Sequence, residues 1–396
     1  MEKQKTVGFL LKRVDCNDGV ASHCETMIRG LKALGWKVVL ITGPVNYNAG
    51  FVSRFQALKD LSEEWIIFED LKPLFPSWGK ITGILELVKK YDISLFHAHG
   101  YTMLLLGRIL KIITGIDCVA TFHPSVHGED PTLLKDAVLR PQTTKYFIFL
   151  KLFAPKVFIA ISSDIERFLL KDLSFHKTKV RKIINGIDTK YFRPPSPEER
   201  ENVRKKLGLE EKDLVCSLVG RFNWNKGHDI LIDAVRQVRN AVPEMSVKCL
   251  FVGGGHQEQE IKEYAFVSDD DSRSFIFLGY VDELREVYWA SDIFVLPSRS
   301  EGCPLVVAEA MSCGTVTIRT EGGGARDQIE DGKTGYIVPF DDPEALSKAI
   351  QKLANKDFRL PMNKDCLEFA SVAFDRELMV EKTEKLYCEC SGMETK

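Results

Sequence analysis

The sequence lacks an excess of charge of either sign. Its 54 Lys and Arg residues are balanced by 56 Asp and Glu residues, so the formal net charge is only −2. A protein that binds nucleic acid through its overall charge carries a clear basic excess. The composition therefore predicts no nucleic-acid partner, and ligands have to be inferred from individual sites.

Long apolar runs and metal-type cysteine patterns are missing too. No stretch approaches the roughly 18 uncharged apolar residues of a membrane-spanning helix, and the first apolar run is shorter than a signal-peptide core. The ten cysteines are scattered without zinc-type spacing. We expect reduced, structural cysteines and a cytoplasmic protein.

What the chain does contain is a regular alternation of short β-rich runs with helical patterns, which predicts βαβ units on parallel sheets. With 396 residues, the chain is too long for one hydrophobic core. We expect an α/β protein of two Rossmann-like, doubly wound domains that face a central cleft, with a boundary near residues 190–208. The expected strands are 6–11, 37–43, 65–70, 93–99, 118–123 and 157–162, then 214–222, 247–255, 274–281, 292–298, 315–320 and 335–339.

The run "EGCPLVVAEAMSCG" at 301–314 places two carboxylates, Glu301 and Glu309, in an apolar segment. Pro304 is suited to the first position of a helix, which we expect to reach about Cys313 and to stop at Gly314. The free N–H groups at such a helix start can bind an anion. The turn concerned contains Gly302, Cys303, Pro304, Leu305 and Val306.

A carboxylate near a bound phosphate would repel it, so each Glu is better suited to accept hydrogen bonds from hydroxyl groups. A nucleotide sugar, with a diphosphate between two polyhydroxylated rings, would satisfy both Glu301 and Glu309. The alternative reading makes Glu301 a surface residue and Glu309 part of a buried ion pair.

Two cations lie at or just after the carboxyl end of the strand expected at 214–222. Arg221 comes directly after the apolar part of this strand, and Lys226 lies five residues further along, ahead of a helix. Arg can bind a diphosphate in bidentate fashion, and Lys adds a point charge. Together they predict a diphosphate site that needs no metal ion, although loop cations are also common in solvent.

Glycine-rich turns end other strands of this half. "VGGGHQ" at 252–257 contains Gly254, and "GYVDE" at 279–283 contains Tyr280 and Val281, which we also assign to the ligand site. Their spacing is not the GxGxxG of a dinucleotide fingerprint. The acidic run "SDDDS" at 268–272 is interpreted as a solvated turn and not as a metal motif.

In the N-terminal half, Gly19 lies in the first loop, where the backbone could approach a diphosphate. Histidines gather at the ends of two later strands, namely His97, His99, His123 and His127. They suggest a polar reaction chamber, in which His123 is the strongest candidate for a functional residue. Zinc is a weaker possibility, because HxH offers no third and fourth ligand at a suitable spacing.

Segment 131–157 interleaves basic residues with large apolar ones, as a helix on a membrane surface does. A helix that covers the N-terminal sheet would explain the pattern equally well.

At this point the sequence resembles a known family. "EGCPLVVAEAMSCG" resembles the E-x7-E motif of family 4 glycosyltransferases, and the segments "GRFNWNKGHDILIDA", "GGARDQIEDGKTGYIV" and "NGIDTKYFRP" are similar to the C-terminal half of that family. The N-terminal half is similar more loosely, through "DGVASHCETMIRGLKALGWKVVLIT" and "HAHG". The resemblance covers nearly the whole chain.

The resemblance implies a GT-B fold with an acceptor domain at 1–190, a donor domain at 191–373 and a last helix, about 374–396, that packs back on the first domain. It assigns Arg221 and Lys226 to the donor diphosphate, Glu301 to the sugar hydroxyls and Glu309 to the ribose. His123 would line the sugar pocket. The glycine pair that is usual in the family's first loop reads Asp18–Gly19 here, which keeps Gly19 as a phosphate contact and leaves the role of Asp18 open.

The implied reaction is a retaining transfer of a hexose-type sugar from a nucleotide sugar, with a UDP-sugar favoured, to a hydroxyl of a glycan, a lipid-linked acceptor or a small molecule. The nucleotide sugar is a co-substrate, and neither a metal nor another cofactor is expected. Peripheral contact with the inner face of the membrane is compatible with segment 131–157. A nucleotide-sugar epimerase and a non-catalytic binding protein of the same fold are the alternatives, and an epimerase would turn over without an acceptor.

Overall fold

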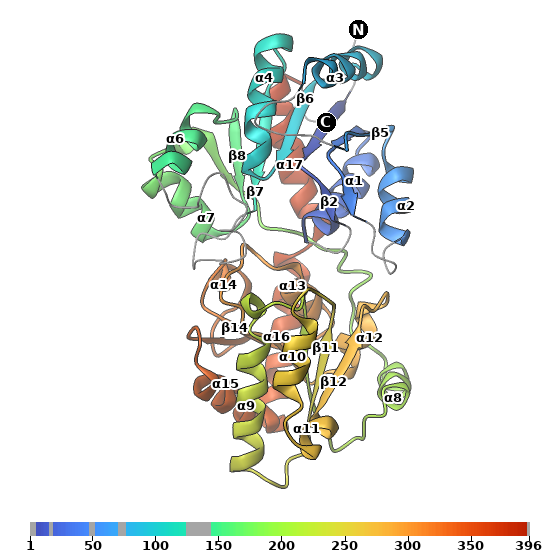
Figure 1. Cartoon of the computed structure of the whole chain (residues 1–396), viewed down its shortest axis with the longest axis vertical. Helices are drawn as coiled ribbons and strands as arrows, with labels where there is room; N and C mark the ends of the chain where they lie inside the picture. Colours follow the sequence, from blue (N-terminus) through green and yellow to red (C-terminus); the bar gives the residue numbers. More distant parts are fainter. Residues whose placement is uncertain (1–4, 16–18, 47–51, 70–76, 124–143, 394–396) are drawn as a thin grey trace. The chain divides into compact units, whose positions relative to one another are not determined.

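The computed structural model describes residues 5–15, 19–46, 52–69, 77–123 and 144–393. The chain forms two compact units (Figure 1). The first is built from the chain up to Gly186 and again from Arg376 onward, and the second extends from Ile187 to Asp375. Each unit has its own parallel sheet.

The sheet of the first unit has seven strands in the order β5-β3-β1-β6-β7-β8-β9, and a separate two-stranded sheet pairs β2 with β4. Its strands are β1 Thr6–Leu11, β2 Val14–Asp15, β3 Lys37–Thr42, β4 Val45–Asn46, β5 Glu64–Ile67, β6 Leu95–His99, β7 Cys118–Phe122, β8 Val157–Ala160 and β9 Val180–Lys182. The strands β1, β6, β7 and β8 are buried along their whole length, as expected of a parallel sheet with both faces covered. The sequence pattern did not predict β9 or the small β2–β4 pair.

The helices of the first unit are α1 Gly19–Ala33, α2 Val52–Leu61, α3 Trp78–Tyr91, η1 Tyr101–Met103, α4 Leu104–Thr114, α6 Thr144–Leu152, α7 Ser163–Arg167, η2 Phe168–Asp172, η3 Lys177–Lys179 and α17 Arg376–Ser391. The last helix, α17, lies among the N-terminal elements (Figure 1) and packs against α1. The two helices come close at Gly30, where a Cβ atom would be 2.3 Å from Cγ2 of Val380. Met379, Val380, Leu386 and Tyr387 thereby join the hydrophobic core of this unit.

The sheet of the second unit has six parallel strands in the order β12-β11-β10-β13-β14-β15. They are β10 Leu214–Val219, β11 Val247–Val252, β12 Phe275–Gly279, β13 Ile293–Leu296, β14 Val316–Thr320 and β15 Gly335–Val338. The helices of this unit are α8 Pro197–Lys206, η4 Trp224–Lys226, α9 His228–Ala241, α10 Glu258–Ala265, α11 Asp269–Ser274, α12 Leu284–Ala290, α13 Leu305–Ser312, α14 Ala325–Gln328, α15 Pro343–Ala354 and α16 Lys356–Ala373. The α/β class and the two doubly wound sheets predicted from the sequence are confirmed.

Two local predictions were wrong. The run "SDDDS" forms the short helix α11 with a capping box at Ser268, and Asp271 is buried between Arg236 and Arg239 instead of lying in a solvated turn. The helix expected to start at Pro304 begins one residue later, because Pro304 is its N-cap with an extended ψ of 127°. The missing N–H of proline costs nothing at either position, so the sequence could not separate the two.

The strand order indicates where along its edge each sheet is expected to bind a ligand. In the first unit the chain runs outward from β1 through β3 to β5, then returns to β6 on the other side of β1. In the second unit β10 plays the part of β1, and β13 that of β6. Ligands of doubly wound folds bind beyond the carboxyl ends of the strands at this switch point. The sites are therefore expected after β1 and β6, and after β10 and β13.

Among the described residues, no helix is long and apolar enough to cross a membrane.

Candidate functional site

In the second unit, the candidate site lies at the switch point between β10 and β13. Lys226 is the last residue of η4, which follows β10, and Glu301 follows β13. The Lys226 Nζ atom lies 2.5 Å from Oε1 of Glu301. Their side chains are only 22% and 10% exposed. Sequence reasoning placed both residues in one site but did not predict that they pair with each other.

Backbone contacts hold these two loops in register. Asn225 accepts a hydrogen bond from the Arg299 N–H at 2.8 Å through its carbonyl oxygen. Gly227, with φ of 70°, lies so close to β13 that a Cβ atom there would be 2.1 Å from the Pro297 carbonyl oxygen. Only glycine fits this position, and Gly227 thereby allows the loop that carries Lys226 to approach the end of β13.

Arg221 is exposed beyond the end of β10, and its guanidinium has no hydrogen bond or ion pair recorded with the described residues. Arg299 is the contrasting case, because it is held by Asp229 at 2.6 Å and by Asp341 at 2.6 Å. Arg221 is therefore the arginine of this edge that can turn toward an anion, whereas Arg299 is a structural residue.

Gln328 holds the start of α13, and a buried arginine, Arg319, holds Gln328 in place. Gln328 donates a hydrogen bond to the Pro304 carbonyl at 2.8 Å, and the Arg319 guanidinium bonds Gln328 and the carbonyl of Gly322. Gly323, with φ of 52°, packs so closely that a Cβ atom would be 2.3 Å from the Glu301 carbonyl oxygen. The glycine-rich turn thus supports the backbone from which Glu301 and the first N–H groups of α13 project.

Glu309 lies on α13 and is buried, with 8% of its surface exposed. The Tyr288 hydroxyl donates a hydrogen bond to its Oε2 atom at 2.8 Å. Burial beside this carboxylate raises the pKa of Tyr288 well above its usual value, so the hydroxyl stays a donor. Sequence reasoning assigned Glu309 to a ribose but did not predict Tyr288 as its protein partner.

The turn at 253–255 is glycine-rich for an internal reason. A Cβ atom at Gly253 would be 2.1 Å from the Gly220 carbonyl oxygen, and one at Gly254 would be 2.7 Å from the Tyr280 ring. These glycines allow the turns after β10, β11 and β12 to pack together, so their presence is explained without a ligand. Tyr280 is 41% exposed and Val281 is partly exposed, so both can still contact one.

At the start of α13, Gly302 is partly exposed, whereas Cys303 and Leu305 are buried. The N–H groups at the beginning of a helix have no acceptor within it, and the helix dipole favours an anion there. With Arg221 and Lys226, this edge offers positive charge from two directions, and Glu301 contributes an acceptor beside it.

In the first unit, a cluster of histidines lies at the switch point of the seven-stranded sheet. His97 uses both ring nitrogens, which lie 2.5 Å from the Tyr387 hydroxyl and 2.7 Å from the Thr121 hydroxyl. Nδ1 of His99 lies 3.2 Å from Nε2 of His123. Burial lowers the pKa of His97, His99 and His123 well below the usual value, so these rings are neutral at pH 7.

Sequence reasoning missed His23 on α1, whose ring centroid lies 5.1 Å from that of His123. Burial lowers the pKa of His23 to about 4, with a smaller opposing effect from Asn185. The sequence offers no short-range signal for this contact, because a helical periodicity explains His23 as a core position. Gly19 begins the same helix and is exposed, and a Cβ atom there would meet nothing within 4 Å. Asp18 and His127 lie outside the described residues.

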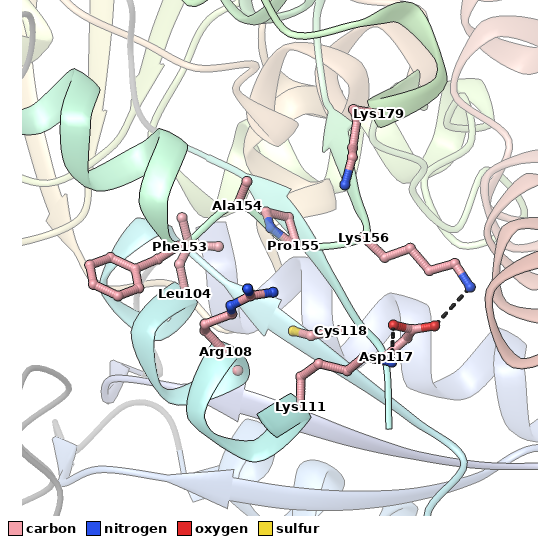
Figure 2. A pocket seen from close by; sticks show the side chains of 11 residues that line it. Leu104, Arg108, Lys111, Asp117, Cys118, Phe153, Ala154, Pro155, Lys156 and Lys179 are labelled. Atoms are coloured by element: carbon pink, nitrogen blue, oxygen red, sulfur yellow. Dashed lines mark hydrogen bonds and ion pairs between the residues drawn. The ribbon is translucent and has the colours of Figure 1, made fainter. Parts of the chain in front are cut away.

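A hollow of about 180 Å³ opens at the other edge of this sheet, beside the amino ends of β7 and β8 (Figure 2). Lys111 and Lys156 each lie 2.7 Å from the Asp117 carboxylate, and Arg108 and Lys179 also line the hollow. It is distant from the carboxyl edge where doubly wound folds bind their substrates. We therefore do not assign the reaction to it.

The chain matches two families, one described as "Glycosyltransferase Family 4" over residues 17–191 and one as "Glycosyl transferases group 1" over residues 213–356. It is 31% identical over 290 residues to a D-inositol 3-phosphate glycosyltransferase of Corynebacterium urealyticum, an alignment that covers 71% of this chain and 68% of that protein.

It is also 25% identical over 322 residues to a UDP-Gal:alpha-D-GlcNAc-diphosphoundecaprenol alpha-1,3-galactosyltransferase of Escherichia coli, which covers 80% of each chain. Among solved structures, HepE of Anabaena in complex with UDP superposes with a TM-score of 0.78 over 97% of this chain and 100% of that one, at 19% identity.

Proposed function

The chain belongs to the family 4 glycosyltransferases and has their GT-B fold, and from this membership we propose that it transfers a hexose-type sugar from a UDP-sugar to an acceptor hydroxyl with retention of configuration. The observation that carries the proposal is the Lys226–Glu301 pair at the switch point of the six-stranded sheet. A UDP donor is supported by the relative named for UDP-Gal and by the UDP bound to the structural neighbour.

We assign the donor diphosphate to Arg221, Lys226 and the start of α13. The ammonium of Lys226 has three N–H donors, so it can bind a phosphate oxygen while it still contacts Glu301. Arg221 can add a bidentate contact, because no described partner holds its guanidinium. Glu301, oriented by Lys226, would accept hydrogen bonds from sugar hydroxyls.

Glu309 and His123 are assigned to the remaining parts of the donor. The Glu309 carboxylate, which accepts from Tyr288 through Oε2, would also accept from the ribose. Glu309 thus has a fixed rotamer before the nucleotide binds, which reduces the entropy that binding would cost. His123, neutral at pH 7, would contact a hydroxyl of the transferred sugar.

In the proposed reaction, the acceptor oxygen bonds to the anomeric carbon on the face from which the diphosphate leaves. The bond between the anomeric carbon and the diphosphate oxygen breaks, and the leaving diphosphate takes the proton of the acceptor hydroxyl. Arg221 and Lys226 stabilise the charge that develops on the diphosphate, a type of interaction worth about 3–4 kcal/mol per donor. We propose no covalent intermediate on the protein.

We further propose that no metal ion takes part in the transfer, since protein cations and a helix start supply the positive charge. Activity should persist in excess EDTA. Loss of activity in EDTA that magnesium or manganese restores would contradict this assignment.

The main experiment is a hydrolysis and transfer screen across UDP-, GDP- and ADP-sugars, with wild type and Arg221→Ala compared. Lys333→Ala is the matched control, since Lys333 is an exposed lysine of the same unit paired with Glu330. We expect turnover with a UDP-sugar, loss in Arg221→Ala and wild-type rates in the control. Conversion of the donor into an epimeric nucleotide sugar, without release of the nucleoside diphosphate, would indicate an epimerase. Saturable donor binding without turnover would indicate a binding protein.

We also propose that the first unit contacts an anionic membrane surface. The described part of segment 131–157 contains α6, where Ile148 and Leu152 are 51% and 63% exposed, and Ile112 on α4 is 73% exposed. Lys111 and Lys156, together with Arg108 and Lys179, lie in the hollow between these helices. Exposed apolar side chains next to cations are typical of interfacial binding. Lys135 and Arg140 are two of the basic residues of segment 131–157, and both lie outside the described residues.

Vesicle co-sedimentation tests this contact. Binding should require phosphatidylglycerol, should weaken with salt, and should fall in an Ile112→Ser/Leu152→Ser variant. Val267→Ser is the control, because Val267 is 74% exposed in the second unit. Equal binding to neutral vesicles, or an equal loss in the control, would refute the proposal.

The nine described cysteines are free thiols, which is typical of reducing compartments, and we accordingly propose a cytoplasmic location.

A further inference from the structure

We propose that His23, His99 and His123 form a binding site for a transition-metal ion of the zinc type. One ring nitrogen of each residue lies within 4.8 Å of those of the other two. Among the described residues, this is the one group of three or more His, Cys, Asp or Glu side chains with such a geometry. HxH spacing alone did not provide a third ligand, and the fold supplies it from α1.

The distances suit a metal after a small adjustment. Two ligands of a tetrahedral zinc ion, at Zn–N distances of about 2.1 Å, are about 3.4 Å apart. His99 Nδ1 and His123 Nε2 are already 3.2 Å apart as a hydrogen-bonded pair, and the ion would take the place of the proton that they share. The nitrogens of the cluster lie within 4.8 Å of one another, so His23 has to approach by at most about 1.4 Å, a shift that rotation about its side-chain torsions can provide.

The hydrogen bonds of the cluster distinguish ligands from supporting residues. The His97 ring packs on His99 in a tilted arrangement, with ring centroids 4.2 Å apart, but both of its nitrogens are occupied by Tyr387 and Thr121. By contrast, neither ring nitrogen of His23 has a hydrogen bond of full geometry with the described residues, and its polar neighbour is Asn185. Unpartnered buried polar atoms are rare and costly, and an ion can satisfy one ring nitrogen of His23.

The chemistry of the donor set favours borderline metals. Imidazole nitrogens suit zinc, copper, nickel and cobalt, whereas magnesium and calcium prefer oxygen ligands. His123 is partly exposed, so an ion can reach the cluster from that side and a fourth ligand can be water.

The consequence for activity rests on the proposed function. A metal held by His123 would withdraw this residue from the transferred sugar, so the ion should inhibit transfer and not support it. Activity should therefore persist in EDTA, which removes the ion from His123, and zinc, which binds His123, should inhibit it.

The site can be tested without any activity measurement. Full-length protein, freed of metal by a chelator, is titrated with Co²⁺ and the visible absorption is recorded. We expect saturable bands of the intensity typical of four- or five-coordinate cobalt, displaced by Zn²⁺. In His23→Gln, affinity should fall by more than the roughly 10–100-fold that loss of an outer-shell partner costs.

His256→Gln is the matched control, because His256 is an exposed histidine of the second unit. It should bind cobalt as wild type does. Should His23→Gln fold poorly, zinc-dependent shifts of the imidazole ¹⁵N resonances of wild type provide the same information. Absence of cobalt bands in wild type, or equal affinity in His23→Gln, would overturn the proposal.

The inhibitory consequence has its own measurement. Zinc should inhibit transfer by wild type and His256→Gln at concentrations that leave His23→Gln at its own metal-free rate. Cobalt binding by a protein that shows no transfer would refute the proposed function and retain the site. If the protein binds cobalt but zinc does not affect transfer, then His123 does not contact the transferred sugar.

Discussion

Lys226 and Glu301 lie 75 positions apart in the sequence, yet their charges meet at 2.5 Å in a partly buried setting. Removal of the lysine has two effects, since it takes a cation from the proposed diphosphate site and leaves a carboxylate without its partner. Lys226→Ala should reduce transfer by about 100–1,000-fold, as loss of one electrostatic contact to developing charge does. Initial rates at saturating donor measure this.

A second variant separates the two effects. Lys226→Ala/Glu301→Gln removes both charges and should recover most of the stability lost in Lys226→Ala, while transfer remains low. A rate within threefold of wild type in Lys226→Ala would contradict the assignment of this residue to the diphosphate.

Glu309→Gln tests the ribose contact. The carbonyl oxygen of Gln can still accept the Tyr288 hydrogen bond, so the free protein should melt close to the wild-type temperature. The affinity for nucleotide should fall by about tenfold, because a neutral amide accepts more weakly than a carboxylate. Thermal melts with and without UDP decide the matter. A large loss of stability with an unchanged UDP-induced shift would mean that Glu309 has a structural role alone.

For individual residues, the sequence patterns predicted which positions lie at the candidate sites but not which side chains they contact. Strand ends and helix starts are local signals, so Arg221, Lys226, Glu301 and His123 could be placed at carboxyl edges. The Lys226–Glu301 pair, the Tyr288–Glu309 hydrogen bond and the contact of His23 with His123 join residues that are distant in sequence. They depend on strand order and helix packing, which a local pattern does not contain.

Among the elements, α17 illustrates packing that the helical pattern could not specify in detail. Its contact with α1 requires Gly30, because any Cβ atom there would overlap Val380. Gly30→Ala should destabilise the first unit by about 1–3 kcal/mol through overpacking. Gly79→Ala on α3 is the control, since a Cβ atom there meets nothing within 4 Å, and this change should be neutral or stabilising.

Urea unfolding followed by circular dichroism compares the two variants. Equal midpoints for Gly30→Ala and Gly79→Ala would show that α17 adjusts without cost. The position of α17 also affects the histidine cluster, because the Tyr387 hydroxyl on α17 lies 2.5 Å from Nδ1 of His97, whose ring contacts that of His99.

For the whole molecule, the alternation of periods was sufficient to predict two parallel α/β sheets, because strands buried on both faces and amphipathic helices leave different repeats in the sequence. The short strands β2, β4 and β9 could not be predicted from the sequence, since two or three residues are too few to show a hydrophobic period. Likewise, α11 was read as a turn because the acidic run conceals a capping box and the buried partner of two arginines.

The stability of the second unit should depend on pH through a histidine outside the histidine cluster. His228, the first residue of α9, is fully buried against Phe222 and Phe251. Burial lowers its pKa to about 3, while nearby Asp229 raises the pKa and Lys226 lowers it further. The unfolded chain binds a proton at this residue near pH 6.5, but the folded chain does so only near pH 3.

The contribution of His228 to stability is therefore fully present above pH 6.5 and is lost as the pH falls toward 3, at up to about 1.4 kcal/mol per pH unit. In His228→Gln, the midpoint of urea unfolding of the second unit should fall less steeply between pH 6.5 and 4 than in wild type, even if the variant is less stable at pH 7. His256→Gln, which changes an exposed imidazole, should retain the wild-type slope, so that the acid response of the carboxylates is common to all three proteins. Parallel curves for wild type and His228→Gln would mean that the buried imidazole takes up its proton without unfolding, and that burial does not keep it neutral.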